Sequence, residues 1–439
     1  LWFPLRKKGI ASMATETIQP VVGPVVGRIR PVGSKSLTNR ALVAAGLAAG
    51  RSTLEGCLAG DDTRHMAEAW RQLGATVQWD EASGRIVVTG TGGRLAPGPR
   101  ELFVGNAGTA MRFLTAVAAV GHGRYRLDGV PRMRERPIED LLVALRALGV
   151  SAVSETGNGC PPVLVEAGGL GGGRVTVSGR ISSQYLSGLL LAAPYAARDV
   201  EIVIDGDLVS KPYADMTCRL MADFGVEVEN EEYRRFYVVA PSRYVARTYA
   251  VEPDATAATY FWAVAAMTGG SVTVEGLTAD SAQGDVAFVH VLEQMGCRVE
   301  SSPEGLTVHG PARLRGVTVD LNAMPDTALT LAVLALAADG PTCIRNVANL
   351  RVKETDRLAA LAAELRKFGA AVDEAADSLT IRPPAILRGA AVATYDDHRM
   401  AMSFALAGLK APGVSIVGAE CVSKTFPDYF ARLRNLVGA

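Results

Sequence analysis

The chain has 439 residues, which is long for one hydrophobic core, so two domains are expected. Hydrophobic residues make up 49% and aromatic residues only 6% of it, and its 46 glycines suit an α/β protein with many tight turns. Its 45 Lys and Arg residues balance its 45 Asp and Glu residues without any basic block, a pattern that excludes a nucleic-acid arm or a membrane-surface patch.

The first informative element is the segment 33–50 (GSKSLTNRALVAAGLAAG), in which a polar loop enters an Ala/Leu helix that the final glycine can end. Ser34 or Ser36 suits the N-cap, where unpaired N–H groups and the positive end of the helix dipole collect. Lys35 adds positive charge there, and Arg40 lies one turn beyond Ser36. The segment predicts an anion-binding helix start, although an ordinary capped surface helix explains it equally well in isolation.

Further polar loops in the first half are GNAGTAMR at 105–112 with Gly108, PRMRERP at 131–137 with Arg132, and SSQ at 182–184. The hydroxyls and amide of Ser182, Ser183 and Gln184 suit a phosphate, because each hydroxyl can donate a hydrogen bond. N-capping alone explains one serine and leaves the other two residues unexplained. Ser210, which precedes Lys-Pro-Tyr, has the same character.

Helix starts in the second half combine acids with cations. Asp326 begins an apolar helix, where N-capping is favoured over a chemical role by about two to one. The segments NLRVKETDR at 349–357, YDDHRM at 395–400 and SKTFPDY at 423–429 place Lys and Arg at predicted helix starts. Because cations at that end oppose the helix dipole, stability does not explain them, and an anionic ligand is the expected compensation.

A repeated helix ending divides the chain into similar units. Five glycines, each after a predicted amphipathic helix and before a strand pattern, lie 71 to 76 residues apart, at 74, 149, 225, 296 and 369. This spacing predicts a repeated α/β unit. A sixth glycine is expected near position 442, beyond the last residue, so strands at 18–29 are expected to complete the last unit.

The repeat therefore predicts six units in two groups of three, with the chain crossing between domains near 31–33 and near 251–254. The predicted domains are residues 33–252, and residues 13–32 together with 253–439. Residues 1–12, which lack a signal-peptide pattern, are interpreted as an extension. A cleft between the two domains is the expected ligand site.

Cysteine, histidine and apolar patterns narrow the class further. The six Cys residues lack C-x-x-C spacing, which indicates reduced thiols in a cytoplasmic protein. Five His residues without H-E-x-x-H spacing argue against a metal site. No apolar run reaches the roughly 18 residues that a membrane-spanning helix needs.

Nine strings resemble the 5-enolpyruvylshikimate-3-phosphate synthase family of enolpyruvyl transferases: GSKSLTNRA, GNAGTAMR, PRMRERPI, SSQYL, SKPY, MPDTA, NLRVKETDRL, YDDHRMAM and SKTFPDYF. They follow the family's order from about Val22 to Phe430, and RVKETDRL and KTFPDYF are highly specific. Two positions depart from the family's pattern. Val32 precedes Gly33 where Pro is usual before the glycine, and Phe113, expected to touch no charged group, stands where several members have Pro.

The resemblance implies an inside-out α/β barrel fold of two domains, each with three βαβαββ units, in agreement with the repeat. It implies transfer of the enolpyruvyl group of phosphoenolpyruvate to the 5-hydroxyl of shikimate 3-phosphate, releasing phosphate, in aromatic amino acid biosynthesis. Neither a metal nor an organic cofactor is implied. The corresponding expectation is a cytoplasmic monomer that binds these two small molecules and is inhibited by glyphosate.

The resemblance also implies residue roles. Shikimate 3-phosphate is expected to contact Lys35, Ser36, Arg40, Ser182, Ser183, Gln184, Ser210, Asp326, Asn349 and Lys353. Of these, Ser36 and Arg40 would hold its carboxylate, and Ser182, Ser183, Ser210 and Lys353 its phosphate. Phosphoenolpyruvate is expected to contact Lys35, Gly108, Arg132, Gln184, Arg357, Arg399 and Lys424, with Arg357 and Arg399 on its carboxylate and with Asp397 and His398 orienting Arg399.

Four positions are candidates for the chemistry. Asp326 is the expected base for the 5-hydroxyl, and Lys35 and Lys424 can neutralise the departing phosphate. Glu354 or Lys35 moves the proton at carbon 3 of phosphoenolpyruvate, and the sequence leaves this choice open.

Two alternatives are weighed against this interpretation. The sister enzyme that acts on UDP-N-acetylglucosamine uses a loop Cys, and residues 106–136 contain none. A non-catalytic anion-binding protein on the same scaffold would be expected to lack Asp326 or Glu354, and both are present.

Overall fold

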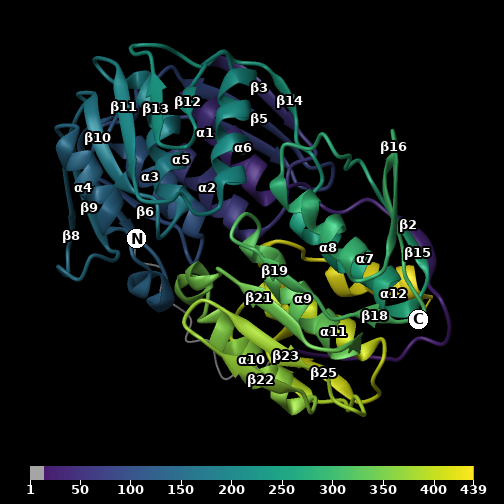
Figure 1. The fold of residues 1–439 in the computed structure, drawn as a ribbon. Helices are drawn as coiled ribbons and strands as arrows, with labels where there is room; N and C mark the ends of the chain where they lie inside the picture. Colours follow the sequence, from purple (N-terminus) through teal and green to yellow (C-terminus); the bar gives the residue numbers. More distant parts are fainter. Residues whose placement is uncertain (1–13, 439) are drawn as a thin grey trace.

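The computed structural model describes residues 14–438, so the proposed extension at 1–12 lies outside the described residues. Two α/β lobes meet along one side (Figure 1). One hydrophobic core is built from residues between Leu37 and Val251, and the other from Ile18, Val25 and residues between Ala255 and Leu433. Within residues 14–438, no helix has both the length and the apolar character needed to cross a membrane.

The first lobe has three four-stranded sheets. Their strand orders are β14 (Thr248–Ala250), β3 (Ala49–Glu55), β5 (Arg85–Thr91), β4 (Thr76–Asp80); then β6 (Arg100–Phe103), β7 (His122–Asp128), β9 (Val163–Gly168), β8 (Ser151–Ser154); then β10 (Gly173–Ser178), β11 (Val200–Asp205), β13 (Arg235–Val238), β12 (Glu229–Glu231). In each sheet the first two strands pair in parallel and the others antiparallel.

The second lobe repeats this plan less regularly. Its sheets are β16 (Arg298–Ser302), β17 (Gly305–His309), β15 (Ser271–Glu275), β2 (Val26–Ile29); then β19 (Thr318–Asp320), β21 (Thr342–Arg345), β23 (Leu379–Arg382), β22 (Ala371–Glu374); then β1 (Thr15–Ile18), β25 (Val414–Val417), β24 (Ala391–Ala393). A two-stranded sheet joins β18 (Leu314–Arg315) to β20 (Ala338–Asp339).

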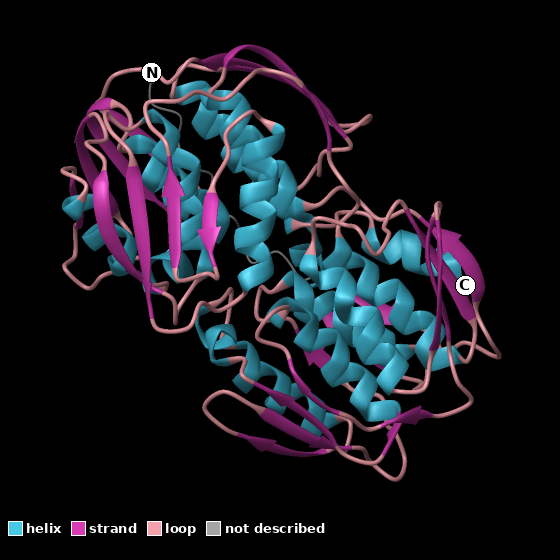
Figure 2. Ribbon diagram, turned by 45° about the horizontal axis from the view of Figure 1, so that its top comes forward, coloured by secondary structure: helices cyan, strands magenta, loops and turns pink. Residues whose placement is uncertain are grey.

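Helices fill the inside of each lobe and sheets form its outside, as Figure 2 shows. The central helices are α1 (Lys35–Leu47), α3 (Gly108–Ala118) and α5 (Ser183–Ala192) in the first lobe, and α7 (Ala255–Thr268), α9 (Ala328–Leu334) and α11 (His398–Gly408) in the second. Nearly every residue of these six is buried, and the exceptions in α1 and α5 are Ser36 and Gln184. The predicted two-domain α/β fold with helices inside is therefore confirmed.

The second helix of each unit ends as the repeat predicts. These helices are α2 (Asp61–Gln72), α4 (Glu139–Ala147), α6 (Lys211–Asp223), α8 (Phe288–Gln294), α10 (Arg357–Lys367) and α12 (Tyr429–Val437). The glycines at 74, 149, 225, 296 and 369 all have φ between +86° and +101°, a conformation that Gly adopts without steric cost. Gly438, with φ +74°, ends α12 in the same way, so the glycine expected near 442 lies earlier than predicted.

Two local predictions are wrong. Helix α1 ends at Leu47, and Gly50 lies in β3 instead of ending the helix. The strands predicted at 18–29 do not complete the last unit. Strand β1, which pairs with β25 there, overlaps the predicted range only at Ile18. Strand β2 pairs in parallel with β15, which gives the fourth unit its first strand.

The two crossing segments lie side by side. Gly33 and Pro253 form an isolated antiparallel bridge, and the Asp254 N–H donates to the Val32 carbonyl at 2.8 Å. Strand β14, just before the second crossing, completes the first unit of the first lobe by pairing with β3. The first crossing follows β2 and the second follows β14. Each of these strands is the parallel edge strand in the first unit of one lobe.

Substitution of Gly46 tests the packing of the central helix α1 against α2. A Cβ at this position in α1 would lie 2.4 Å from the ring of Trp70, which is fully buried on α2. We expect Gly46→Ala to lower the free energy of unfolding by about 1–3 kcal/mol, because a rigid ring must move. Chemical denaturation measures this, with Gly168→Ala as the control, since no heavy atom lies within 4 Å of its added Cβ. Equal stability of the two variants would contradict this packing.

Candidate active site

A cavity between the lobes collects the residues predicted for shikimate 3-phosphate. All ten of them line it: Lys35, Ser36, Arg40, Ser182, Ser183, Gln184, Ser210, Asp326, Asn349 and Lys353. Thr109, Ile181 and Tyr213 complete the lining. Three cations and one carboxylate therefore face this space, which makes it a positively charged enclosure.

Helix starts position the first-lobe residues. Ser34 caps α1, since its Oγ accepts from the Leu37 N–H at 3.4 Å, and this leaves Ser36 facing the cavity. Ser182 caps α5 by accepting from the Gln184 N–H at 3.2 Å. Ser210 precedes α6 with a left-handed φ of +57° and makes no side-chain cap. Its hydroxyl is therefore not used to cap the helix start.

Four hydrogen bonds between the lobes lie around the cavity. The Ser210 N–H donates to the Asn322 carbonyl at 3.2 Å, and the Asn349 amide donates to the Ser210 Oγ at 3.4 Å. Arg132 donates to the Lys353 carbonyl at 3.1 Å, and the Lys35 N–H donates to the Asp254 carboxylate at 3.1 Å. The described conformation is therefore a closed one.

Arg40 is a buried cation that the protein does not neutralise. Its guanidinium donates only to neutral groups, to Thr217 Oγ1 at 2.8 Å, the Ser36 carbonyl at 3.0 Å, and Ser187 Oγ and the Tyr213 carbonyl, both at 3.2 Å. Burial lowers its pKa to about 10, so it stays charged at neutral pH. Among residues 14–438 no carboxylate pairs with it. Because burying an unpaired charge is costly, an anionic ligand is the natural partner.

The expectation that Phe113 touches no charged group is wrong. Its ring lies 5.1 Å from the Arg40 guanidinium carbon, so the residue does touch a charged group. Such a cation–π contact partly compensates the loss of water around Arg40.

Beside this cavity, Arg357 forms the centre of a carboxylate cluster. The start of α10 places it 1% exposed, with Asp397 at 2.7 Å, Asp326 at 2.9 Å and Glu354 at 3.0 Å. The alternative that Asp326 serves as an N-cap is wrong, because it makes no side-chain cap bond and pairs with cations instead. Lys353 lies 3.5 Å from the same carboxylate.

The contacts of the Arg399 side chain differ from the prediction that Asp397 and His398 orient it. Its guanidinium pairs with Asp326 at 3.1 Å and donates to the Tyr260 hydroxyl at 3.4 Å. Asp397 caps the backbone N–H of Arg399 and directs its carboxylate to Arg357. His398 is fully buried, and its ring makes no hydrogen bond within the described residues. Asp397 therefore orients Arg357, and neither residue orients the Arg399 side chain.

A second cluster joins Lys35 to Lys424 through Asp62, which the sequence analysis did not find. The Asp62 carboxylate lies 3.5 Å from Lys35 Nζ and 3.3 Å from Lys424 Nζ, and Lys424 also lies 3.4 Å from Glu354. Asp62 stands in the first turn of α2, where acids are common because they complement the helix dipole. Nothing in its local sequence therefore distinguished it.

Arg112 and Arg136 are further buried cations outside the predicted set. Arg112 donates to the Pro137 carbonyl at 2.6 Å, and Arg136 donates to the Asn106 carbonyl at 3.1 Å. Neither pairs with a carboxylate in the described part of the chain. A Cβ on Gly108 would lie 2.4 Å from Arg136 Nη2, so Gly108 leaves room for this guanidinium.

Both central carboxylates are ionised in this state. Burial would raise the pKa of Asp326, but Arg399 and Lys353, with Arg357 and Lys35, hold it well below its usual range. Burial acts likewise on Glu354, whose pKa Arg357 and Lys424 hold well below its usual range. The protein's own acids thus partly neutralise the cations around them.

An inside-out α/β fold with a cation-lined cavity between its lobes defines an enzyme of anionic small molecules. Residues 20–433 match the sequence model of the EPSP synthase family, 3-phosphoshikimate 1-carboxyvinyltransferase. The chain is 47% identical over 426 residues to the 3-phosphoshikimate 1-carboxyvinyltransferase of Trichormus variabilis, covering 97% of this chain and 100% of the relative.

The chloroplastic enzyme of the same name from Brassica napus is 49% identical over 440 residues, which cover 96% of this chain and 85% of that one. The solved EPSP synthase of Acinetobacter baumannii superposes with a TM-score of 0.79 at 26% identity, covering 96% of this chain and 97% of that chain. The chain belongs to the EPSP synthase family.

Asp285, behind Asp326, gives a pH prediction. It accepts from the Tyr213 hydroxyl at 3.2 Å, and burial, followed by the charge of Asp326, raises its pKa to about 6. Because this exceeds the unfolded value of about 3.9, the folded state binds the extra proton, and stability falls as pH rises from about 4 to 6. We expect Asp285→Asn to remove that part of the pH dependence.

Chemical denaturation at pH 5 and pH 7.5 checks this, with exposed Asp280→Asn as the matched control. An unchanged difference between the two pH values in Asp285→Asn would contradict the prediction.

Proposed function

We propose that the cavity and the neighbouring carboxylate clusters perform the family's reaction on shikimate 3-phosphate and phosphoenolpyruvate. The 5-hydroxyl oxygen attacks carbon 2 of phosphoenolpyruvate while carbon 3 gains a proton. That proton is then lost again as the bond to the phosphate oxygen breaks and phosphate leaves. The observation that carries this proposal is the buried, unneutralised Arg40 at one end of a cavity rich in hydroxyls and cations.

The proposed seat of shikimate 3-phosphate follows from the lining. Ser36 and Arg40 hold its carboxylate, and Ser182, Ser183, Ser210 and Lys353 surround its phosphate. Gln184, Asn349 and Asp326 face the ring hydroxyls. The grouping of these ten residues around one space supports the assignment.

Phosphoenolpyruvate is proposed to lie where the two carboxylate clusters meet. Arg357 and Arg399 take its carboxylate, since a planar guanidinium can bind two oxygens. Lys35, Arg132, Lys424, Gln184 and the Gly108 N–H surround its phosphate. Arg136, next to Gly108, is an additional candidate for this phosphate because it is buried without a carboxylate partner.

The proposed proton transfers depend on an exchange of partners. The cations around Asp326 and Glu354 hold the pKa values of both acids well below their usual range. When a substrate carboxylate takes Arg357 and Arg399, those cations neutralise the two acids less, and both pKa values rise. Asp326 then becomes a better base for the 5-hydroxyl, and Glu354 can hold the proton that moves to and from carbon 3.

The proposal also covers the location, the oligomeric state and the inhibition of the protein. It places the protein in the cytoplasm as a monomer, and the six free Cys residues of the described chain support the reducing compartment. Glyphosate, a small anion, is proposed to inhibit by occupying the phosphoenolpyruvate seat.

Arg40→Met tests the proposed function. We expect the KM for shikimate 3-phosphate to rise at least 100-fold, because charged hydrogen bonds contribute about 1.5–3 kcal/mol each. We expect the free energy of unfolding, measured without substrate, to change by no more than about 1–3 kcal/mol, because Arg40 loses four hydrogen bonds but no ionic partner. Phosphate release from phosphoenolpyruvate measures the reaction.

Wild type should release phosphate with shikimate 3-phosphate and not with UDP-N-acetylglucosamine, and the exposed Arg51→Met should behave like wild type. Release with the nucleotide sugar instead would overturn the proposal.

Asp326→Asn separates catalysis from binding. We expect kcat to fall by about 10²–10⁴-fold, the range for loss of a positioned base, with the Kd of shikimate 3-phosphate within tenfold of wild type. Single-turnover kinetics and calorimetry measure the two quantities. Asp320→Asn, a nearby carboxylate that bonds Asn322 and Asn346, is the control. A kcat within tenfold of wild type would show that Asp326 is not the base.

Gly108→Ala tests the phosphoenolpyruvate seat. The new methyl group would lie 2.4 Å from Arg136 Nη2, so this guanidinium beside the proposed seat must move. We expect the inhibition constant of glyphosate to rise more than the KM of phosphoenolpyruvate, because the longer inhibitor has less room. Equal increases, or a wild type indifferent to glyphosate, would count against this geometry.

A further inference from the structure

Asp62 is a buried carboxylate to which the proposed reaction gives no role. It stands in the first turn of α2 and is 2% exposed. Its Oδ2 atom receives no hydrogen bond within residues 14–438. An acid in a first helical turn complements the helix dipole, but this effect is weak and does not require burial. Because burying a carboxylate without hydrogen bonds is costly, the helix dipole alone does not explain Asp62.

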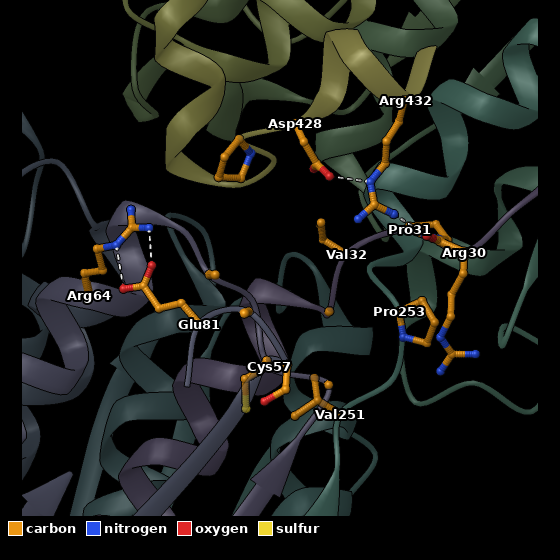
Figure 3. A pocket seen from close by; sticks show the side chains of 17 residues that line it. Arg30, Pro31, Val32, Cys57, Arg64, Glu81, Val251, Pro253, Asp428 and Arg432 are labelled. Carbon is orange, nitrogen blue, oxygen red and sulfur yellow. Dashed lines mark hydrogen bonds and ion pairs between the residues drawn. The ribbon is translucent and has the colours of Figure 1, made fainter. Parts of the chain in front are cut away.

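The adjacent acid, Asp61, has a different environment. Its side chain is half-exposed, pairs with Arg64 at 2.8 Å and accepts from the Ser423 hydroxyl at 2.6 Å. Arg64 also binds Glu81 at 2.7 Å, as Figure 3 shows. Asp61 therefore already supplies a first-turn acid with surface partners, and the burial of Asp62 needs a separate reason.

The partners of Asp62 are two lysines from different lobes. Its carboxylate lies 3.5 Å from Lys35 Nζ of the first lobe and 3.3 Å from Lys424 Nζ of the second. Both lysines are 8% exposed. Two ammonium groups beside one point repel each other, and the repulsion is screened less in a buried place than in water. A carboxylate between them offsets this repulsion, so Asp62 allows the two cations to stand together.

Lys424 reaches Asp62 across the boundary between the lobes. It ends the short helix η7 (Ala419–Lys424), and its Nζ also donates to the Asn106 carbonyl of the first lobe at 2.7 Å. The start of α2 lies tightly against it, since a Cβ on Gly60 would lie 2.6 Å from the Lys424 carbonyl oxygen. First-lobe groups therefore fix both the backbone and the ammonium group of Lys424.

We propose that Asp62 is a positioning residue that holds Lys35 and Lys424 side by side at the phosphate of phosphoenolpyruvate. This inference rests on the proposed function, which assigns both lysines to that phosphate. Asp62 acts through the lysines and takes part in no bond-forming or bond-breaking step. Because Lys424 belongs to the other lobe, the pair of cations is complete only when the lobes are closed.

Asp62→Asn removes the charge and keeps the shape of the side chain. We expect kcat/KM for phosphoenolpyruvate to fall at least 30-fold, with the Kd of shikimate 3-phosphate, measured by calorimetry, within threefold of wild type. Asp61→Asn is the matched control, expected within twofold of wild type in both quantities, because Asp61 pairs with Arg64. A kcat/KM within threefold of wild type, or an equal loss of shikimate 3-phosphate affinity, would overturn the proposal.

A double-mutant cycle separates positioning from a general structural effect. In the Lys424→Met background, Asp62→Asn has one lysine fewer to act through. We therefore expect its effect on kcat/KM for phosphoenolpyruvate to be at least threefold smaller there than in the wild-type background. The same fold-change in both backgrounds would show that Asp62 does not act through Lys424, and the proposal would fail.

Gly60→Ala tests the same contact without removing a charge, so it decides the question even where Asp62→Asn folds poorly. Alanine adopts the backbone φ of −129° at this position, and the new methyl group must push the Lys424 carbonyl away from α2. We expect kcat/KM for phosphoenolpyruvate to fall at least tenfold, with the Kd of shikimate 3-phosphate within threefold of wild type. Gly168→Ala, whose Cβ meets no heavy atom within 4 Å, is the control.

Equal kcat/KM values in Gly60→Ala and Gly168→Ala would contradict the proposed role of the contact between α2 and Lys424. All of these quantities are ratios to wild type, whose phosphate release with shikimate 3-phosphate tests the proposed function separately. An active wild type with an unaffected Asp62→Asn variant would refute this inference alone, so the two failures are distinguishable.

Discussion

Positive charge buried between the two lobes is the constraint on which the rest of the site depends. Arg40, Arg112 and Arg136 are at most 4% exposed and have no carboxylate partner among the described residues. The other cations share Asp62, Asp326, Glu354 and Asp397. Such an arrangement is costly by itself, and it is stabilised when anions enter.

The inside-out fold explains how so many cations reach one place. Each lobe surrounds apolar central helices with sheets (Figure 2), and residues at the starts of α1, α5 and α6 line the active-site cavity. Ser34, Ser182 and Asp397 cap three of these starts and fix where the following side chains point. A fold that hides its helices thus presents their positive ends to a ligand.

The buried carboxylates of Asp326 and Glu354 pair with cations in the structure and also take part in the proposed reaction. Asp326 and Glu354 partly neutralise Arg357, Arg399 and Lys424 within the second lobe. Across the lobes, Asp62 of the first lobe pairs with Lys424 of the second. In the proposed reaction, substrate anions take over these cations and leave the same two acids beside the reacting atoms. The proposal therefore gives one set of contacts a role in both stability and reactivity.

Much of the fold and of the cavity was predictable because the signals are local. A glycine with positive φ after a helix, a capping serine and an apolar run depend on neighbours in sequence, and the repeat at 74–369 and the Ser182 cap show this. The partners of Asp326, the role of Asp62, the contact between Gly108 and Arg136, and the pairing of β2 with β15 were decided by the tertiary structure alone. Each joins residues far apart in the chain, and an ion pair or a steric contact depends on distances that only the packed fold sets.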